Sequence, residues 1–178
     1  ISCLCFNFAA AEMTVKCIFV MGVSGCGKTT IGKCLADKFV AHFEDADDYH
    51  SEANRAKMSR GIALNDEDRY PWLQEVANLG KYSIGRIVIA CSALKKNYRQ
   101  ILSAPLDGNY IFVYLNVGRS ELERRVRLRK GHFVDCRLLD SQLETLEPPC
   151  NEHNCITIDA SGSVEQVVNE IISALGRL

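Results

Sequence analysis

The sequence predicts an α/β fold in which a five-stranded parallel sheet carries helices on both faces. Short apolar runs rich in β-branched residues recur along the chain, and such runs are typical of strands buried on both faces. Each run is followed by a polar or amphipathic stretch that suits a helix. Because strands that alternate with helices favour parallel pairing, these observations together indicate the α/β class.

The first predicted strand covers residues 15–21, and a glycine-rich turn follows it. Apolar residues then recur at helical spacing, which predicts a helix through Ile31, Cys34, Leu35 and Phe39. The remaining strands are expected at residues 42–45, 86–91, 110–115 and 155–158. A last helix, with Ser161 or Ser163 as its N-cap, has an apolar face made of Val164, Val167, Val168, Ile171, Ile172 and Leu175.

The chain is expected to form one domain over residues 13–178, because no internal repeat, low-complexity tract or linker divides it. Residues 1–12 are expected to form a disordered N-terminal tail. They are apolar but contain no Lys or Arg, so they make a poor signal or transit peptide. The oligomeric state stays open, with a homodimer as one option.

Composition limits the class of protein. The net charge of -1 gives no reason to expect a nucleic acid or an acidic membrane as partner. No apolar run approaches the roughly 18 residues that a membrane-spanning helix needs. The nine cysteines are odd in number and include no CxxC pair, which argues against a disulfide framework and a structural zinc site. We therefore expect a cytoplasmic protein in a reducing compartment.

A phosphate-binding loop of the form GxxxxGK[ST] follows the first strand, at Gly22, Val23, Ser24, Gly25, Cys26, Gly27, Lys28 and Thr29. Its glycines let successive N–H groups turn toward phosphate oxygens, and the next helix adds its positive N-terminal end. Lys28 would bridge the β- and γ-phosphates, the Thr29 hydroxyl would ligate Mg²⁺, and Thr30 belongs to the same ATP-binding set. The setting between a buried strand and a helix predicts a P-loop NTPase fold.

Cys26 lies inside this loop, and its sequence context is compatible with two roles. A helix N-terminus lowers the pKa of a thiol, which would suit a redox switch. A small side chain that simply fits the loop is the alternative, and it is favoured because no resolving cysteine is evident.

The segment after the second strand, residues 43–73, distinguishes among the many classes of P-loop protein. It is rich in ionisable side chains and would lie at the carboxyl end of the sheet, beside the phosphates. Asp45 and Asp47 are two residues apart, so their carboxylates can together hold Mg²⁺ through water and accept a proton from an attacking hydroxyl. Lys57 and Arg69 could bind an anionic acceptor. For each of these residues the alternative is a solvated surface charge.

The same segment resembles the acceptor-binding region of the gluconokinase family. The matching positions are Asp45, Asp47, His50, Asn54, Lys57, Met58, Gly61, Leu64, Asp66, Asp68, Arg69, Trp72 and Leu73. Two later blocks resemble the same family, one at residues 90–99 (ACSALKK, then YR) and one at residues 129–148 (RKGHF, LL, SQ and LEP). With the P-loop they make four blocks in family order.

The resemblance implies a fold like that of nucleoside monophosphate and shikimate kinases, with a small lid near residues 125–145. It also implies transfer of the γ-phosphate of MgATP to D-gluconate, giving 6-phosphogluconate and ADP. The catalytic residues would then be Lys28, Asp45, Asp47, Arg125 and Arg129, and the Mg²⁺ ligands would be Thr29 and Asp45, through water. The acceptor would contact Asp47, His50, Lys57, Arg69, Ser92, Lys95, Arg99, His132 and Gln142. The choice of catalytic base between Asp45 and Asp47 stays open.

The basic stretch at residues 119–130 is interpreted as part of this lid. Arg125 and Arg129 are four residues apart and share a helix face. The resemblance implies that they bind ATP and bring positive charge to the transferring phosphoryl group as the lid closes. Arg124 and Arg127 are expected to be solvated, and His132 either contacts the substrate or packs at a hinge.

Two other functions stay open. One is a kinase of the same fold with another acceptor, such as shikimate or a nucleotide. The other is a catalytically weak ATP-binding module that serves in interactions. Gln100, where the family usually carries Asp, and a shortened segment at residues 73–85 leave the turnover open as well.

Overall fold

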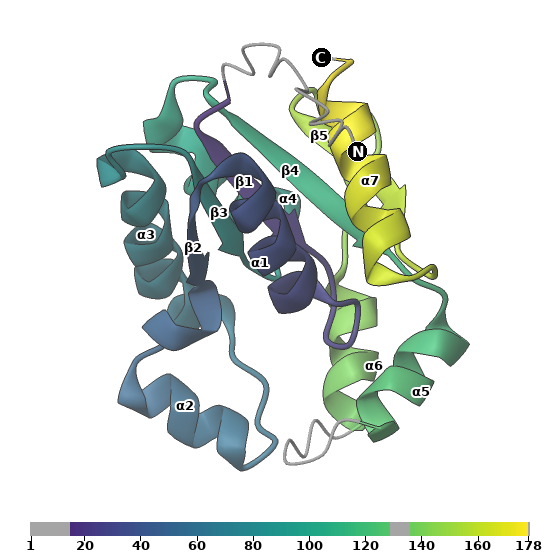
Figure 1. Ribbon diagram of the computed structural model, residues 1–178. Coiled ribbons are helices and arrows are strands. Elements are labelled where there is room, and N and C mark those ends of the chain that lie inside the picture. Colours follow the sequence, from purple (N-terminus) through teal and green to yellow (C-terminus); the bar gives the residue numbers. More distant parts are fainter. Residues whose placement is uncertain (1–14, 129–135, 178) are drawn as a thin grey trace, which may run out of the picture.

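The computed structural model describes residues 15–128 and 136–177, and within them five parallel strands form one sheet (Figure 1). The strand order is β2-β3-β1-β4-β5, so β1 lies at the centre. The strands are β1 (Cys17–Met21), β2 (His42–Asp45), β3 (Ile87–Ala90), β4 (Tyr110–Asn116) and β5 (Cys155–Asp159). Each predicted strand is confirmed to within two residues at either end, as is the α/β class.

Helices cover both faces of this sheet. They are α1 (Lys28–Phe39), α2 (Glu52–Ser59), α3 (Asp66–Tyr82), α4 (Lys96–Ser103), α5 (Arg119–Leu128), α6 (Cys136–Thr145) and α7 (Val164–Leu175). Two short 3₁₀ turns, η1 (Ala46–Tyr49) and η2 (Ala104–Leu106), complete the set. Ser163 is the N-cap of α7 and forms a capping box with Gln166, which confirms one of the two predicted caps.

The sheet separates two hydrophobic cores because successive residues of a strand point to opposite faces. In β1, Ile18 and Val20 pack into the core under α1 and α7, which also receives α5 and α6. Phe19 packs into the core on the other face, under α3 and α4. All the carboxyl ends of the strands meet at one edge of the sheet, where the predicted site residues follow β1, β2 and β3.

The described part of the chain bears on two further expectations. None of its helices is long and apolar enough to cross a membrane. Six cysteines in these ranges are free thiols, namely Cys17, Cys26, Cys34, Cys91, Cys150 and Cys155. The expected tail at residues 1–12 lies outside the described residues, and the division into one domain with a lid stays a prediction.

Candidate active site

The P-loop joins the central strand β1 to α1, and its glycines are there for steric reasons. Gly22 and Gly25 have φ angles of 143° and 85°, in the region that L-residues rarely adopt. A Cβ on Gly22 would lie 2.8 Å from Cys26 Sγ, and one on Gly25 would lie 2.9 Å from Val126 Cγ2 on α5. The N-cap of α1, Gly27, provides no side-chain cap, so the first amides of α1 are left for an anion.

Two side chains place the charges of this loop. Lys28 Nζ donates to the carbonyl of Val23 at 3.1 Å, which holds the ammonium across the loop. The hydroxyl of Thr29 donates to Asp45 Oδ2 at 2.7 Å, and the other carboxylate oxygen of Asp45 accepts from the Asp47 amide at 3.2 Å. The two residues predicted to hold Mg²⁺ are therefore in direct contact, one in the first turn of α1 and the other at the end of β2.

Cys26 is buried in the P-loop, where its sulfur packs against Gly22. Burial raises the pKa of this thiol, and the nearby Lys28 and Arg125 only partly oppose the effect. A raised pKa keeps the thiol protonated and unreactive. The structure thus supports a packing role for Cys26 over a redox switch.

Asp47 and His50 lie together on and after η1. Asp47 is exposed, and its Oδ1 is 4.0 Å from His50 Nε2. The His50 ring is buried and stacks on Trp72 with the ring centroids 4.2 Å apart, while Trp72 Nε1 donates to the Ala46 carbonyl at 2.7 Å. Burial lowers the pKa of His50, so its imidazole is neutral near pH 7. The neutral His50 ring, which is stacked on Trp72, therefore lies next to the Asp47 carboxylate.

The cations that were predicted to bind the acceptor differ in their partners within the protein, and the two lysines form ion pairs with aspartates. Lys57 Nζ is 2.6 Å from Asp68 Oδ1, and Lys95 Nζ is 2.8 Å from Asp66 Oδ1. The hydrogen bonds from Lys95 and the Tyr98 hydroxyl lower the pKa of Asp66, which keeps it ionised.

Arg69 donates to the Leu64 carbonyl and to the Tyr98 hydroxyl. Within the described ranges it has no carboxylate partner. Arg69 is thus the candidate cation whose charge a substrate carboxylate could still neutralise.

Arg99 has a different position from the one expected. Its side chain is 2% exposed, and its Nε donates to Glu152 Oε2 at 2.9 Å. Its other nitrogens donate to Glu152 and to the carbonyls of Ala93 and Leu94. The expected contact with the acceptor is not supported, because the guanidinium is satisfied inside the protein. Ser92 is half-buried beside the P-loop, and its carbonyl accepts from the Gly22 amide at 3.3 Å.

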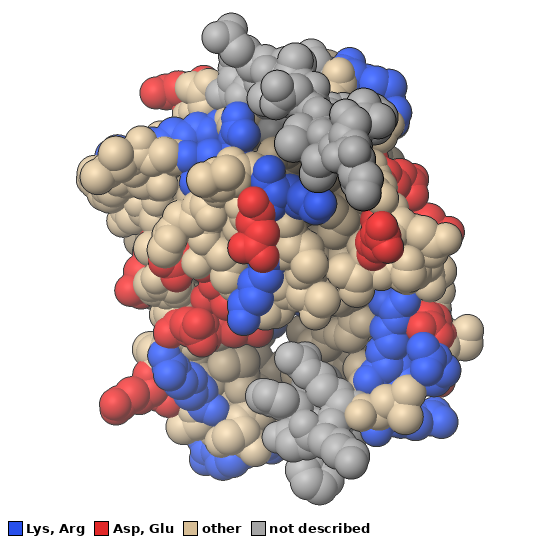
Figure 2. All heavy atoms as spheres, in the orientation of Figure 1, with Lys and Arg blue, Asp and Glu red and all other residues tan. Residues whose placement is uncertain are grey.

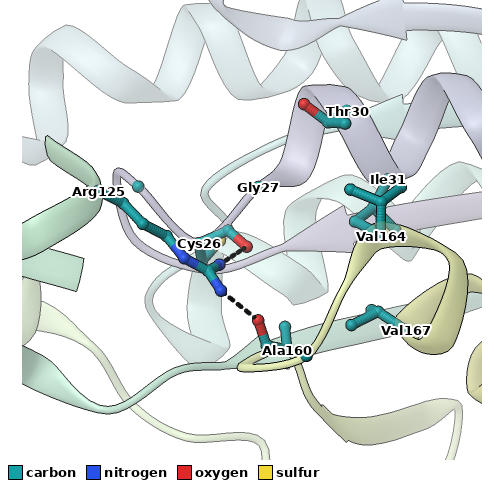
Figure 3. A pocket seen from close by; sticks show the side chains of 10 residues that line it. Cys26, Gly27, Thr30, Ile31, Arg125, Ala160, Val164 and Val167 are labelled. Atoms are coloured by element: carbon teal, nitrogen blue, oxygen red, sulfur yellow. Dashed lines mark hydrogen bonds between the residues drawn. The ribbon is translucent and has the colours of Figure 1, made fainter. Parts of the chain in front are cut away.

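Arg125 borders a pocket of about 230 Å³ beside the P-loop (Figure 3). Its guanidinium donates to the carbonyls of Ala160 at 2.9 Å and Cys26 at 3.4 Å, and Glu121 accepts from its Nε at 2.7 Å. The other walls are Gly25, Gly27, Thr30, Ile31, Gly162, Val164 and Val167. Arg125 therefore connects α5, the P-loop and the loop before α7. The other predicted lid residues, Arg129 and His132, lie outside the described residues.

Gln142 reaches the P-loop from α6. Its Oε1 accepts from the amide of Ser24 at 2.7 Å, so the structure places this predicted acceptor-binding residue against the ATP-binding loop. Sequence reasoning assigned no role to Asp66, Tyr98 or the pocket wall at residues 160–167. The wall could have been found from its place at the carboxyl end of β5. Asp66 and Tyr98 belong to the matched blocks but had no predicted partner.

Charges of opposite sign flank the hollow between η1 and α5 (Figure 2). Acidic side chains gather over the end of β2 and η1, where the sequence places Asp45, Asp47 and Asp48. The arginines of α5 lie on the other side and are largely paired: Arg124 with Glu121 at 2.7 Å, and Arg127 with Glu123 at 3.5 Å. Arg124 and Arg127 are exposed, as expected.

Comparisons with known proteins agree with this geometry. A family model for shikimate kinase matches residues 24–176. The chain is 41% identical to a gluconokinase of Arabidopsis thaliana, over 92% of this chain and 94% of that protein. It is 39% identical to the thermosensitive gluconokinase of Escherichia coli K12, over 92% and 89%.

Solved structures give the same result. A gluconokinase from Sinorhizobium meliloti superposes with a TM-score of 0.85 at 39% identity, over 90% of this chain and 91% of that one. A shikimate kinase from Bacteroides thetaiotaomicron shares the fold, with a TM-score of 0.64 at 24% identity, over 90% and 98%.

Proposed function

Because the chain belongs to the gluconokinase family of P-loop kinases, we propose that it transfers the γ-phosphate of MgATP to D-gluconate, giving 6-phosphogluconate and ADP. The observation that carries the proposal is the Thr29–Asp45 contact at 2.7 Å. It joins the phosphate-binding loop to the strand end where the acceptor segment begins. The phosphoryl donor and the acceptor hydroxyl can therefore meet over this pair.

ATP would bind along the P-loop. The backbone amides of the loop and of the first turn of α1 would face the phosphates. Lys28, which donates to the Val23 carbonyl across the loop, would supply positive charge to the β- and γ-phosphates. The pocket beside Arg125 would take the base, between the apolar side chains of Ile31, Val164 and Val167.

The oxygen ligands at this site suit Mg²⁺. Thr29 and Asp45 offer a hydroxyl and a carboxylate, which are hard donors, and a magnesium ion in kinases takes its other ligands from water and phosphates. Among the described residues no group of three or more His, Cys, Asp or Glu could hold a metal ion. When bound there, Mg²⁺ would neutralise charge on the phosphates.

The two aspartates take separate roles in this proposal. Both oxygens of Asp45 are engaged, by Thr29 and by the Asp47 amide, which suits a fixed metal-holding group. The carboxylate of Asp47 is 74% exposed and is backed by the neutral His50, so it can accept the proton of the attacking hydroxyl. We therefore assign the base to Asp47.

Arg69 is assigned to the carboxylate of gluconate. A guanidinium binds a carboxylate through two parallel N–H groups, and Arg69 lacks an acidic partner among the described residues. Its bonds to the Leu64 carbonyl and the Tyr98 hydroxyl fix its direction. This assignment explains why the acceptor should be an acid rather than a neutral sugar.

The test is ADP release from MgATP by the purified chain, with D-gluconate, shikimate and AMP offered separately and the product identified by mass. ADP formed with gluconate, together with 6-phosphogluconate, is the expected result. ADP formed with another acceptor instead would support a kinase activity but rule out gluconate as the substrate. Binding of ATP without turnover on any of the three would favour a nucleotide-binding module.

A further inference from the structure

The guanidinium of Arg99 connects two segments that are far apart in the sequence. One is the segment at residues 92–96, called the 92–96 loop below, which follows β3 and ends at the first residue of α4. The other is the segment before β5 that carries Glu152. Arg99 donates to the carbonyls of Ala93 at 2.9 Å and Leu94 at 3.2 Å, while Glu152 accepts from the opposite side of the same guanidinium. The buried guanidinium thus binds this loop to the segment that carries Glu152.

The backbone of the 92–96 loop has an unusual conformation that hydrogen bonds from outside the loop stabilise. Ala93 has a φ of 46°, a left-handed conformation that residues with a side chain rarely adopt. The Leu94 carbonyl also accepts from the Glu147 amide at 2.8 Å, and the Glu147 carboxylate accepts from the Lys96 amide at 2.7 Å. The segment after α6 therefore holds the loop from outside, while Arg99 holds it from within.

The 92–96 loop contacts both the ATP-binding side and the acceptor side of the proposed site. At its start, the carbonyl of Ser92 accepts from the amide of Gly22, the first residue of the P-loop. Near its end, Lys95 binds Asp66, whose carboxylate also accepts from the Tyr98 hydroxyl, and that hydroxyl in turn accepts from Arg69. The loop thus spans the distance between the ATP side and the acceptor side.

We propose that Arg99 is a positioning residue, which holds the 92–96 loop so that Lys95 and Asp66 present Arg69 to the acceptor. The inference rests on the proposed function, since it concerns how the gluconate site is shaped. An arginine is required because one planar guanidinium can serve a carboxylate and two carbonyls at once. A lysine, with a compact ammonium on a flexible stem, cannot hold all of them.

The first test is Arg99→Lys, with Arg177→Lys as the control. Arg177 is exposed at the end of the chain, far from the proposed site in the sequence, and donates to the hydroxyl of Ser173 at 2.9 Å. We expect kcat/KM for gluconate to fall on the order of 10-fold in Arg99→Lys, mainly through KM, with the Kd for ATP within about twofold of wild type. The control should match wild type in both. Equal kinetics in the two variants, or parallel losses for ATP and gluconate, would overturn the proposal.

A second measurement reads the loop directly and does not depend on the acceptor. Amide hydrogen exchange in Arg99→Lys and in Glu152→Gln should be faster at residues 92–96, while the amides of Gly22, β1 and β4 stay as protected as in wild type. Unchanged exchange at the loop would refute the inference. A wild-type enzyme that ignores gluconate would contradict the proposed function instead, and the exchange measurement would still decide the role of Arg99.

Discussion

Thr29 Oγ1 and Asp45 Oδ2 lie 2.7 Å apart, although Thr29 lies in the first turn of α1 and Asp45 ends the edge strand β2. The strand β3 lies between β1 and β2 in the sheet, so this contact closes over its carboxyl end. It fixes the spacing between the phosphate loop and the acceptor segment.

Thr29→Val removes the hydroxyl but keeps the shape of the side chain. The substitution deletes a proposed Mg²⁺ ligand and leaves Asp45 Oδ2 without its donor. Steady-state kinetics with MgATP and gluconate should show a loss in kcat on the order of 100-fold. Thr29→Ser restores the oxygen and should remain near wild type. A fully active Thr29→Val enzyme would remove Thr29 from the metal site.

Asp47→Asn should abolish most turnover while leaving nucleotide binding intact. The amide cannot accept the proton of the gluconate hydroxyl, so kcat is expected to fall by about 10²- to 10⁴-fold. The Kd for ATP, measured by calorimetry, should not change. The neighbouring Asp48→Asn serves as control, because Asp48 is exposed and has no assigned role. If Asp48→Asn were the more damaged enzyme, the base would have been misassigned.

Arg69→Gln should weaken the binding of gluconate and leave the binding of ATP unchanged. The loss of a charged hydrogen-bonding pair corresponds to a rise in KM for gluconate of about 10- to 100-fold. The KM for ATP should stay within experimental error. Arg60→Gln is a suitable comparison, because Arg60 is exposed and donates to a carbonyl of its own helix, that of Ala56. Equal KM values for gluconate in the two variants would argue against carboxylate binding by Arg69.

Cys26 should resist alkylation at neutral and mildly alkaline pH. Burial raises its pKa, so the reactive thiolate forms only when the pH rises above that raised value. Peptide mapping after iodoacetamide treatment at pH 7 and pH 9 should find Cys150, which is exposed, labelled and Cys26 unlabelled. Rapid labelling of Cys26 with loss of activity would reinstate the redox switch.

The sequence was most informative where function depends on local pattern. The P-loop motif and the rule that parallel strands end at one edge together predicted that Thr29 and Asp45 would be close. The strands were predictable because each is a short, continuous apolar run. Charge pairing was not predictable, since no local signal tells which partner a cation selects. Arg99, for example, binds a glutamate 53 residues away, and burial changed it from a candidate ligand into an internal support.

The same limit applied to the pocket beside Arg125. Its walls come from the P-loop, α1, α5 and the start of α7, which only the folded chain brings together. Arg125 was predicted from its place on the helix, but its carbonyl partners Cys26 and Ala160 were not. Arg125 could therefore be proposed from the sequence as a site residue, whereas its contacts with Cys26 and Ala160 needed the structure.

The close approach of Gly25 to Val126 matters for anyone who wishes to exchange parts between related kinases. A methyl group added at Gly25 would lie 2.9 Å from a Val126 methyl and 3.3 Å from the Leu122 carbonyl, so the loop and α5 are fitted to each other. A chimera that imports a foreign lid with a bulkier residue at position 126 would push on the nucleotide loop itself. The transplantable module is the P-loop together with α5, and the two have to be inherited as a pair.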